Sequence, residues 1–143
     1  MDKLALSRIC AFADPVLLKT LAEKAAAGLK VILLKGPEKT IVLLQSREPV
    51  QHSRFYLGEL LAAHCVVEIA GVRGAAVQMG DDLDKARAAA ILDAAHTGRF
   101  PCFAQVEPEL LRLETERKAA LAKEAAEIWR TRVSFEALED REL

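Results

Sequence analysis

The chain has 143 residues, of which 52% are hydrophobic and 29% charged, and its formal net charge is -1. This balance of charge gives no field that would attract a nucleic acid or an anionic membrane surface, so neither is expected as a partner. Residues 1–20 lack a long apolar run, and nowhere do about 18 apolar residues follow one another, so we predict neither a secretory signal nor a membrane span. The length suits a single domain over residues 1–143.

Two helices are predicted at the N-terminus, the first over about residues 3–12. The second begins at Asp14, whose carboxylate can accept backbone N–H groups as an N-cap, and Pro15 is tolerated at the first helical position. Leucine and alanine then recur at helical spacing, and Gly28 can end this helix in the left-handed conformation.

A β-hairpin is predicted next. LKVILLK (29–35) and TIVLLQS (40–46) are short apolar runs, and the turn formers Gly36, Pro37, Glu38 and Lys39 separate them.

Further strands are predicted after a loop that contains Pro49. They are SRFYLGE, LAAHCVVEIA and RGAAVQM, with Gly58, Gly71 and Gly74 marking bends or turns. Because strand follows strand with no helix between, the pattern favours an antiparallel sheet.

The segment GDDLDKARAAAILDAA (80–95) predicts an alanine-rich helix packed on this sheet. Asp81 or Asp82 can cap it, its apolar stripe comprises Leu83, Ala86, Ala90 and Ala94, and it ends before Gly98. The pattern lacks the alternating oxygen ligands and the sixth-position glycine of an EF-hand. Capping is the favoured interpretation of these acids, and a metal- or phosphate-linked role is the alternative.

A linker, GRFPCFAQ, and a long helix from about Pro108 to Arg130 complete the chain. Leu110, Leu113, Leu121 and Ile128 can share one apolar stripe. At ~1.5 Å per residue the helix would be about 35 Å long, more than a small domain needs, so we expect the region of about 107–135 to reach a partner. The predicted fold class is therefore α+β: an antiparallel β-sheet with N-terminal helices, an Ala-rich helix on the sheet and a long C-terminal helix.

Side chains for nucleophilic catalysis are poorly arranged. His64 and Cys65 are adjacent on a predicted strand, so they point to opposite faces and cannot readily exchange a proton. Cys10, Cys65 and Cys102 form no CxxC pair, which indicates packing residues in a reduced, cytoplasmic protein. His52 and His96 are interpreted as solvated or locally bonded.

Two further charged residues have ordinary interpretations beside functional ones. Arg73 lies between Gly71 and Gly74, where it could meet an anion but is more typical of an exposed turn. Glu59 could be a buried functional acid or a solvated residue at a strand end. From the pattern alone we assign no catalytic, cofactor-binding or metal-ligating residue.

Several short motifs follow one another in a particular order along residues 8–135. They are Pro37-Glu38, Arg47, the F-x-LGE of Phe55, Leu57, Gly58 and Glu59, the helix start and body at Gly80, Asp82, Ala86, Ile91, Asp93 and Ala94, and TRVSF at 131–135. In order and spacing this chain resembles the PhnG family, a small subunit of the bacterial carbon-phosphorus lyase system that breaks down phosphonates. The chain departs from the family pattern at EPVQHS (48–53) in place of a glycine-rich loop, and at Ala63, His64, Lys85 and Ser134.

The resemblance implies membership of a hetero-oligomeric core complex with the other carbon-phosphorus lyase core subunits, beside which self-association is also considered. That complex transfers a phosphonate such as methylphosphonate to the ribose C1 of ATP with loss of adenine, giving ribose 1-phosphonate 5-triphosphate. ATP is then a substrate of the complex, this chain holds no cofactor, and the nucleosidase and radical chemistry belong to other subunits. No catalytic activity is expected of the isolated chain.

The C-terminal helix offers candidates for partner contacts. They are Trp129, Arg132, Val133 and Phe135, since an aromatic residue beside an arginine is typical of interface anchors. The alternative is that Trp129 and Phe135 pack on their own sheet. Two other functions stay open: a non-catalytic interaction or regulatory module with a PhnG-like fold, and a free-standing enzyme acting on a small ligand.

Overall fold

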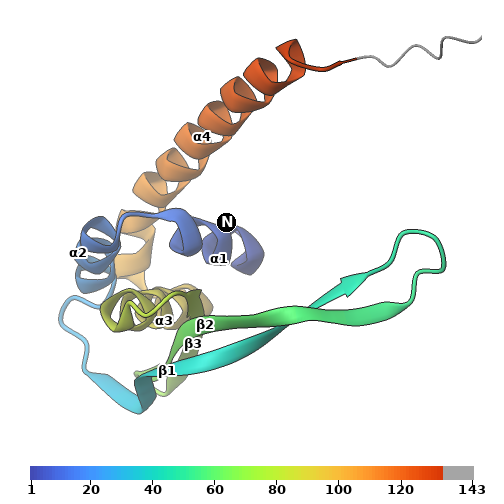
Figure 1. The fold of residues 1–143 in the computed structure, drawn as a ribbon. Coiled ribbons are helices and arrows are strands. Elements are labelled where there is room, and N and C mark those ends of the chain that lie inside the picture. The colour runs from blue at the N-terminus through green and yellow to red at the C-terminus, as the bar shows by residue number, and fades with distance from the viewer. Residues whose placement is uncertain (134–143) are drawn as a thin grey trace, which may run out of the picture.

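The computed structural model describes residues 1–133 as three layers of helix, helix and sheet from which two elements project (Figure 1). The three strands form an antiparallel sheet in the order β1-β2-β3. In chain order the elements are α1 (Lys3–Phe12), α2 (Pro15–Ala25), β1 (Val31–Arg47), β2 (Arg54–Ile69), β3 (Val72–Met79), α3 (Leu83–Thr97) and α4 (Pro101–Arg130). The predicted α+β class, with its N-terminal helices, alanine-rich helix and long C-terminal helix, is confirmed.

Aspartates begin three of the helices. Asp14 accepts the N–H groups of Val16 and Leu17 at 3.0 Å each, and Asp82 accepts that of Lys85 at 2.9 Å. Asp2 does the same for α1. Each carboxylate satisfies donors that the first helical turn leaves without a partner. The capping interpretation is therefore confirmed for Asp14 and for Asp82.

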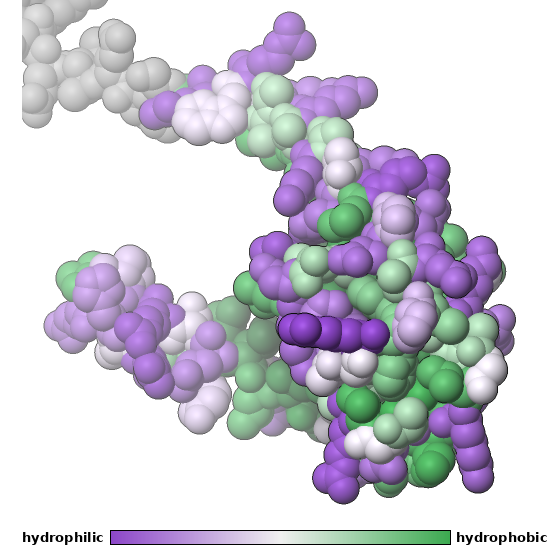
Figure 2. Space-filling view, turned by 180° about the vertical axis from the view of Figure 1, so that it is seen from behind, coloured by the Kyte–Doolittle hydropathy of each residue, from purple (hydrophilic) through white to green (hydrophobic). Residues whose placement is uncertain are grey.

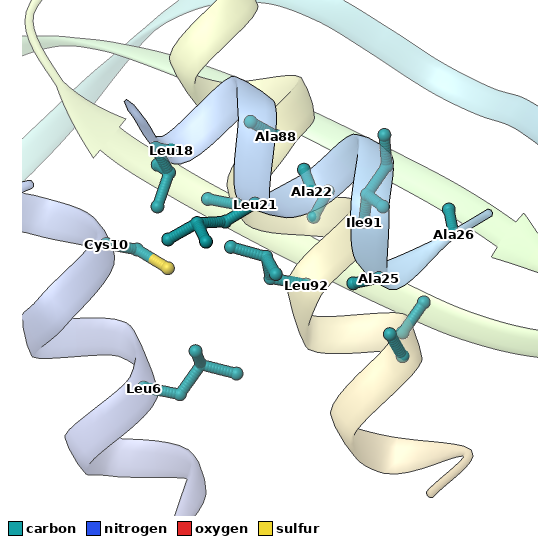
Figure 3. Packing of buried hydrophobic residues seen from close by; sticks show 14 of the residues in the cluster. Leu6, Cys10, Leu18, Leu21, Ala22, Ala25, Ala26, Ala88, Ile91 and Leu92 are labelled. Carbon is teal, nitrogen blue, oxygen red and sulfur yellow. The ribbon is translucent and has the colours of Figure 1, made fainter. Parts of the chain in front are cut away.

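The core lies between α3 and the elements around it. Leu18 and Leu21 of α2 and Leu6 and Cys10 of α1 close over Leu92 of α3 (Figure 3). Most of the circumference of α3 is buried, as expected of a helix that has the sheet on one side and helices on the other. Alanine supplies much of this surface and lets the backbones approach closely.

Gly74 shows how close that approach is. A Cβ atom added at Gly74 would lie 2.3 Å from the Ala90 carbonyl oxygen and 2.4 Å from the Ala94 nitrogen. The prediction that Gly74 marks a bend is wrong, because it lies inside β3 and its missing side chain makes room for α3.

The predicted hairpin at Gly36 and Pro37 is also wrong. Residues 31–35 and 40–46 belong to one continuous strand, β1, and the turn formers between them are absorbed as an irregularity in its pairing with β2. Gly36 has φ +72°, and a Cβ there would come within 2.6 Å of the His64 carbonyl oxygen. A bulge takes up extra residues without reversing the chain.

The strands predicted on either side of residue 60 are likewise one strand, β2, with Gly58 in its interior. The tight turn lies instead at Ala70 and Gly71, which have φ of 49° and 79° and connect β2 to β3. Two positive φ values suit a two-residue hairpin turn. The prediction of a turn at Gly71 is therefore confirmed.

The expected linker before the last helix is only residues 98–100, because α4 begins at Pro101 and contains Pro108. Pro101 lies in the first turn, where the absence of its N–H is harmless. Phe103, Val106 and Leu110 pack on the body of the protein. From Lys118 to Val133 every residue is exposed, so this part of α4 projects away (Figure 1).

Candidate partner-binding surfaces

The first projecting element is the outer part of the β1–β2 hairpin, residues 40–61, which we call the arm. The third strand stops short of it, since Met79, the last residue of β3, pairs with Ala62. The arm is therefore two strands wide and extends beyond the helices that cover the rest of the sheet (Figure 1). A two-stranded ribbon of this kind is marginally stable on its own in water.

Apolar side chains point to both faces of the arm. Ile41, Leu43 and Leu61 lie on the face that carries α3 nearer the body, and they are 63%, 55% and 48% exposed. Val42, Leu44 and Leu60 lie on the opposite face and are partly buried. Figure 2 shows apolar residues where the arm leaves the body and mostly hydrophilic residues toward its tip.

The tip of the arm carries two arginines opposite each other. Arg47 and Arg54 are directly paired across the strands, both are exposed, and neither makes an ion pair with any residue of 1–133. The nearby Glu48 carboxylate instead accepts the N–H groups of Val50 and Gln51 at 2.6 and 2.7 Å. Like charges placed opposite each other destabilise a strand pair.

The second projecting element is the C-terminal half of α4. Leu121 and Ile128 follow Leu110 by about three and five helical turns, so they continue the stripe that packs on the body. They are 47% and 62% exposed, because the body ends before them. Of the predicted stripe, only the portion up to Leu113 is packed.

Three of the four predicted partner-contact residues are described, and all three are exposed. Trp129 and Val133 are 65% and 68% exposed, and the Arg132 guanidinium lies 4.9 Å from the centre of the Trp129 ring. The alternative that Trp129 packs on its own sheet is therefore wrong. Phe135 lies outside the described residues.

The residues of the family motifs divide into two groups. Phe55, Leu57 and Glu59 are exposed on the arm, around Gly58. For Glu59 this confirms the predicted exposure to solvent, although the residue lies inside β2 and not at a strand end.

The other group organises the connection between β3 and α3. Gly80 has φ +100° after β3, and Asp82 caps α3. Asp93 is 7% exposed, accepts the Ala75 N–H at 3.0 Å and pairs with the Lys3 ammonium at 3.1 Å. This second group has a structural role.

The residues considered for chemistry lie apart. His64 faces away from α3 and its Nε2 is 3.2 Å from a Glu38 carboxylate oxygen, whereas Cys65 is buried on the α3 side. Burial raises the pKa of the Cys65 thiol, as it does that of Cys10. Their separation confirms that His64 and Cys65 form no catalytic pair.

The remaining candidates have partners within the chain. Arg73 is exposed as predicted, but it lies in β3 and not in the turn, and its Nε lies 3.6 Å from a carboxylate oxygen of Glu68. His96 Nε2 lies 2.9 Å from the Met1 carbonyl oxygen, so this histidine is bonded, as one of its two interpretations held, but to the distant N-terminus. Within residues 1–133 no three His, Cys, Asp or Glu side chains gather in a way that could hold a metal ion.

The fold and its two exposed apolar projections define a small α+β protein whose surface is suited to binding another polypeptide. The sequence matches the family model described as Phosphonate metabolism protein PhnG over residues 3–139, so the chain belongs to the PhnG family and has a role in phosphonate metabolism. A search of curated proteins gave no significant match. Among the described helices, none has both the length and the apolar composition needed to cross a bilayer.

Proposed function

We propose that this protein is a non-catalytic subunit of the carbon-phosphorus lyase core complex. In that role it supports the transfer of a phosphonate, such as methylphosphonate, to the ribose C1 of ATP. A phosphonate oxygen forms the new bond to C1, the bond from C1 to adenine N9 breaks, and adenine leaves with a proton. The product is ribose 1-phosphonate 5-triphosphate.

Two observations support the proposal. Membership of the PhnG family gives the chain its role in phosphonate metabolism. The exposed apolar arm supports a role as a subunit of a complex. Binding of a partner would remove side chains such as Ile41 and Leu43 from water, which lowers the free energy of the system. The exposed Trp129 on α4 offers a second contact of the same kind.

The contribution of this chain is structural. The carboxylates best placed to act, Asp82 and Asp93, are engaged in holding α3, and the Cys10 thiol is buried in the core. ATP and the phosphonate are substrates of the complex, and we expect the reacting groups to come from other subunits. The protein is expected to work in the cytoplasm, where the nucleotide is available.

Co-expression tests this function. The chain, carrying the only affinity tag, is expressed with the other carbon-phosphorus lyase core subunits of its own source, and the purified material is weighed by native mass spectrometry. We expect a defined hetero-oligomer, and adenine release from ATP with methylphosphonate should need this chain. If the tagged chain is recovered alone while the other subunits assemble with one another, the proposal fails.

That failure would favour the second candidate, a regulatory or interaction module with a PhnG-like fold. The departures from the family pattern support this candidate, since EPVQHS (48–53) forms the tip of the arm and Ala63 and His64 lie at its base. A changed arm would select a different partner.

A further inference from the structure

We propose that the arm inserts into another protein subunit, which adds an extended segment to the free edge of β2 and places a carboxylate against Arg47 and Arg54. This inference rests on the proposed function. It names the surface through which the subunit assembles and the chemistry of the partner. Three features of the arm support the inference.

The first feature is the lack of charge along an apolar ribbon. Residues 40–46, TIVLLQS, contain no charged residue and no proline, two of the devices that keep exposed strands from pairing with other chains, although their pairing with β2 shifts register between Leu44 and Gln45. Ile41 and Leu43 are more than half exposed in this segment. A two-stranded ribbon of this composition is marginally stable in water, and a surface that covers its apolar side chains would stabilise it.

The second feature is the free edge of β2. Residues 54–60 pair with β1 on one side only, because Gly80, whose N–H donates to the Leu61 carbonyl at 2.9 Å, is the last residue to bond β2 from the β3 side. A partner strand collinear with β3 would supply the missing backbone hydrogen bonds and cover the apolar faces. An extended peptide segment is therefore the ligand that fits this edge.

The third feature is the pair of arginines at the tip of the arm, which indicates the charge of the partner. Arg47 and Arg54 lie side by side across the strands and form no ion pair within residues 1–133, since the Glu48 carboxylate is engaged with backbone N–H groups, and two guanidinium groups can hold a carboxylate through charge-assisted hydrogen bonds. Such a carboxylate would remove the repulsion between the two arginines.

A second copy of this chain fits less well. The only acidic residues of 40–61 are Glu48 and Glu59, and the Glu48 carboxylate already accepts two N–H groups of its own turn. A second arm would thus offer Glu59 as its one carboxylate that accepts no backbone N–H, together with two more arginines. We therefore assign the arm to a different subunit with an acidic residue beside an apolar strand.

The test compares variants in the co-expression system described above. The apolar variant is Ile41→Thr with Leu43→Thr, in which both new side chains are β-branched and suit a strand, and its control is Val77→Thr, exposed in β3. The charge variant is Arg47→Glu with Arg54→Glu, and its control is Lys19→Glu with Lys24→Glu on the exposed side of α2. Circular dichroism and urea unfolding of each isolated chain confirm that it folds.

We expect both arm variants to bind the other subunits at least about tenfold more weakly, with the controls within about twofold of the wild type. Hydrogen exchange should show amides of residues 54–60 becoming protected when the complex forms.

If the wild type assembles and the arm variants assemble equally well, the arm inference is overturned and the proposed function stands. If the wild type does not assemble, both are overturned. Assembly without protection of residues 54–60 overturns strand addition. A homodimer of the isolated wild type that the arm variants abolish would assign the arm to a second copy instead.

Discussion

The carboxylate of Asp93, near the middle of α3, accepts the backbone N–H of Ala75 in β3 at 3.0 Å. β3 is the outer strand of the sheet, so this hydrogen bond occupies part of an edge that would otherwise face water or another chain. It also fixes the position of α3 along the strand, one residue away from the tight contact at Gly74.

Replacing Asp93 by alanine should therefore lower the free energy of unfolding by about 1–3 kcal/mol, because the Ala75 N–H loses its hydrogen bond to a charged carboxylate that is itself buried. Asp93→Asn should be milder, since an amide oxygen can still accept this bond and the ion pair that it loses involves an exposed Lys3. Urea unfolding followed by circular dichroism measures both variants. Equal stability of Asp93→Ala and the wild type would contradict this role.

Gly74→Ala should be strongly destabilising, by about 1–3 kcal/mol or more, because the new Cβ would overlap the backbone of α3 at Ala90 and Ala94. Gly58→Ala is the matched control, since a Cβ there meets nothing within 4 Å. It should leave stability nearly unchanged. Thermal unfolding of the two variants separates the effect of close packing at Gly74 from the general effect of replacing a glycine within a strand.

Asp82→Ala should cost about 1 kcal/mol through loss of the α3 cap, whereas Asp82→Ser should restore most of it. Asp81→Ala should have little effect, because Asp81 is exposed and makes only a surface ion pair with Lys39 at 3.4 Å. The denaturant midpoints of the Asp82 and Asp81 variants, compared with that of the wild type, measure these losses of stability. A larger loss at Asp81 than at Asp82 would show that the acids act in some way other than capping.

The Cys10 thiol should resist alkylation in the folded protein. Burial, and to a smaller degree the Asp93 carboxylate, raises the pKa of Cys10 from 9.0 to about 12, so the reactive thiolate is scarce at pH 8. Iodoacetamide labelling followed by mass spectrometry should modify the partly exposed Cys102 first. Early labelling of Cys10 would reveal frequent opening of the core.

The same pKa shift predicts the alkaline dependence of stability. Below pH 9 both folded and unfolded chains keep the Cys10 proton, so its contribution to stability is complete. Between about pH 9 and 12 the unfolded chain loses this proton while the folded chain keeps it, so stability falls by at most about 1.4 kcal/mol per pH unit. A Cys10→Ala variant, measured across the same range, should show a shallower fall than the wild type.

Trp129→Ala should leave the free energy of unfolding within about 0.5 kcal/mol of the wild type, because this indole is mostly exposed. Phe103→Ala, in the packed part of the same helix, should cost about 3–5 kcal/mol. Assembly with the other core subunits should weaken in the first variant. Unfolding of the chain by Trp129→Ala would refute the assignment of this residue to a partner contact.

The sequence predicted the features that depend on neighbouring residues. Asp14 with Pro15 and Asp82 before an alanine run each specify a helix start through local hydrogen bonds, and both helices are present. The succession of strands with no helix between them predicted an antiparallel sheet correctly. These signals need no knowledge of what lies across the fold.

Features that depend on distant contacts were predicted less well. Gly36, Gly58 and Gly74 looked like turns, but a glycine also serves a bulge, an open strand position or a close contact with a helix, and only the partner across the sheet decides which. The projection of the arm was missed for the same reason, because an apolar strand has the same sequence pattern whether it is buried or exposed. The long final helix was predicted to reach beyond the domain, and the exposure of Trp129 agrees with that expectation.

The arm is built from residues that are close together in the chain, while the core of the body also needs α3 and the start of α4. During synthesis from the N-terminus, the hairpin of residues 31–69 is therefore complete before α3, the helix that covers its inner half, has been made. Its local contacts favour early formation, and apolar strands exposed at that stage are prone to aggregate. We expect the timing of partner supply, and not only the affinity of the finished subunits, to decide how much of this protein accumulates in a usable form.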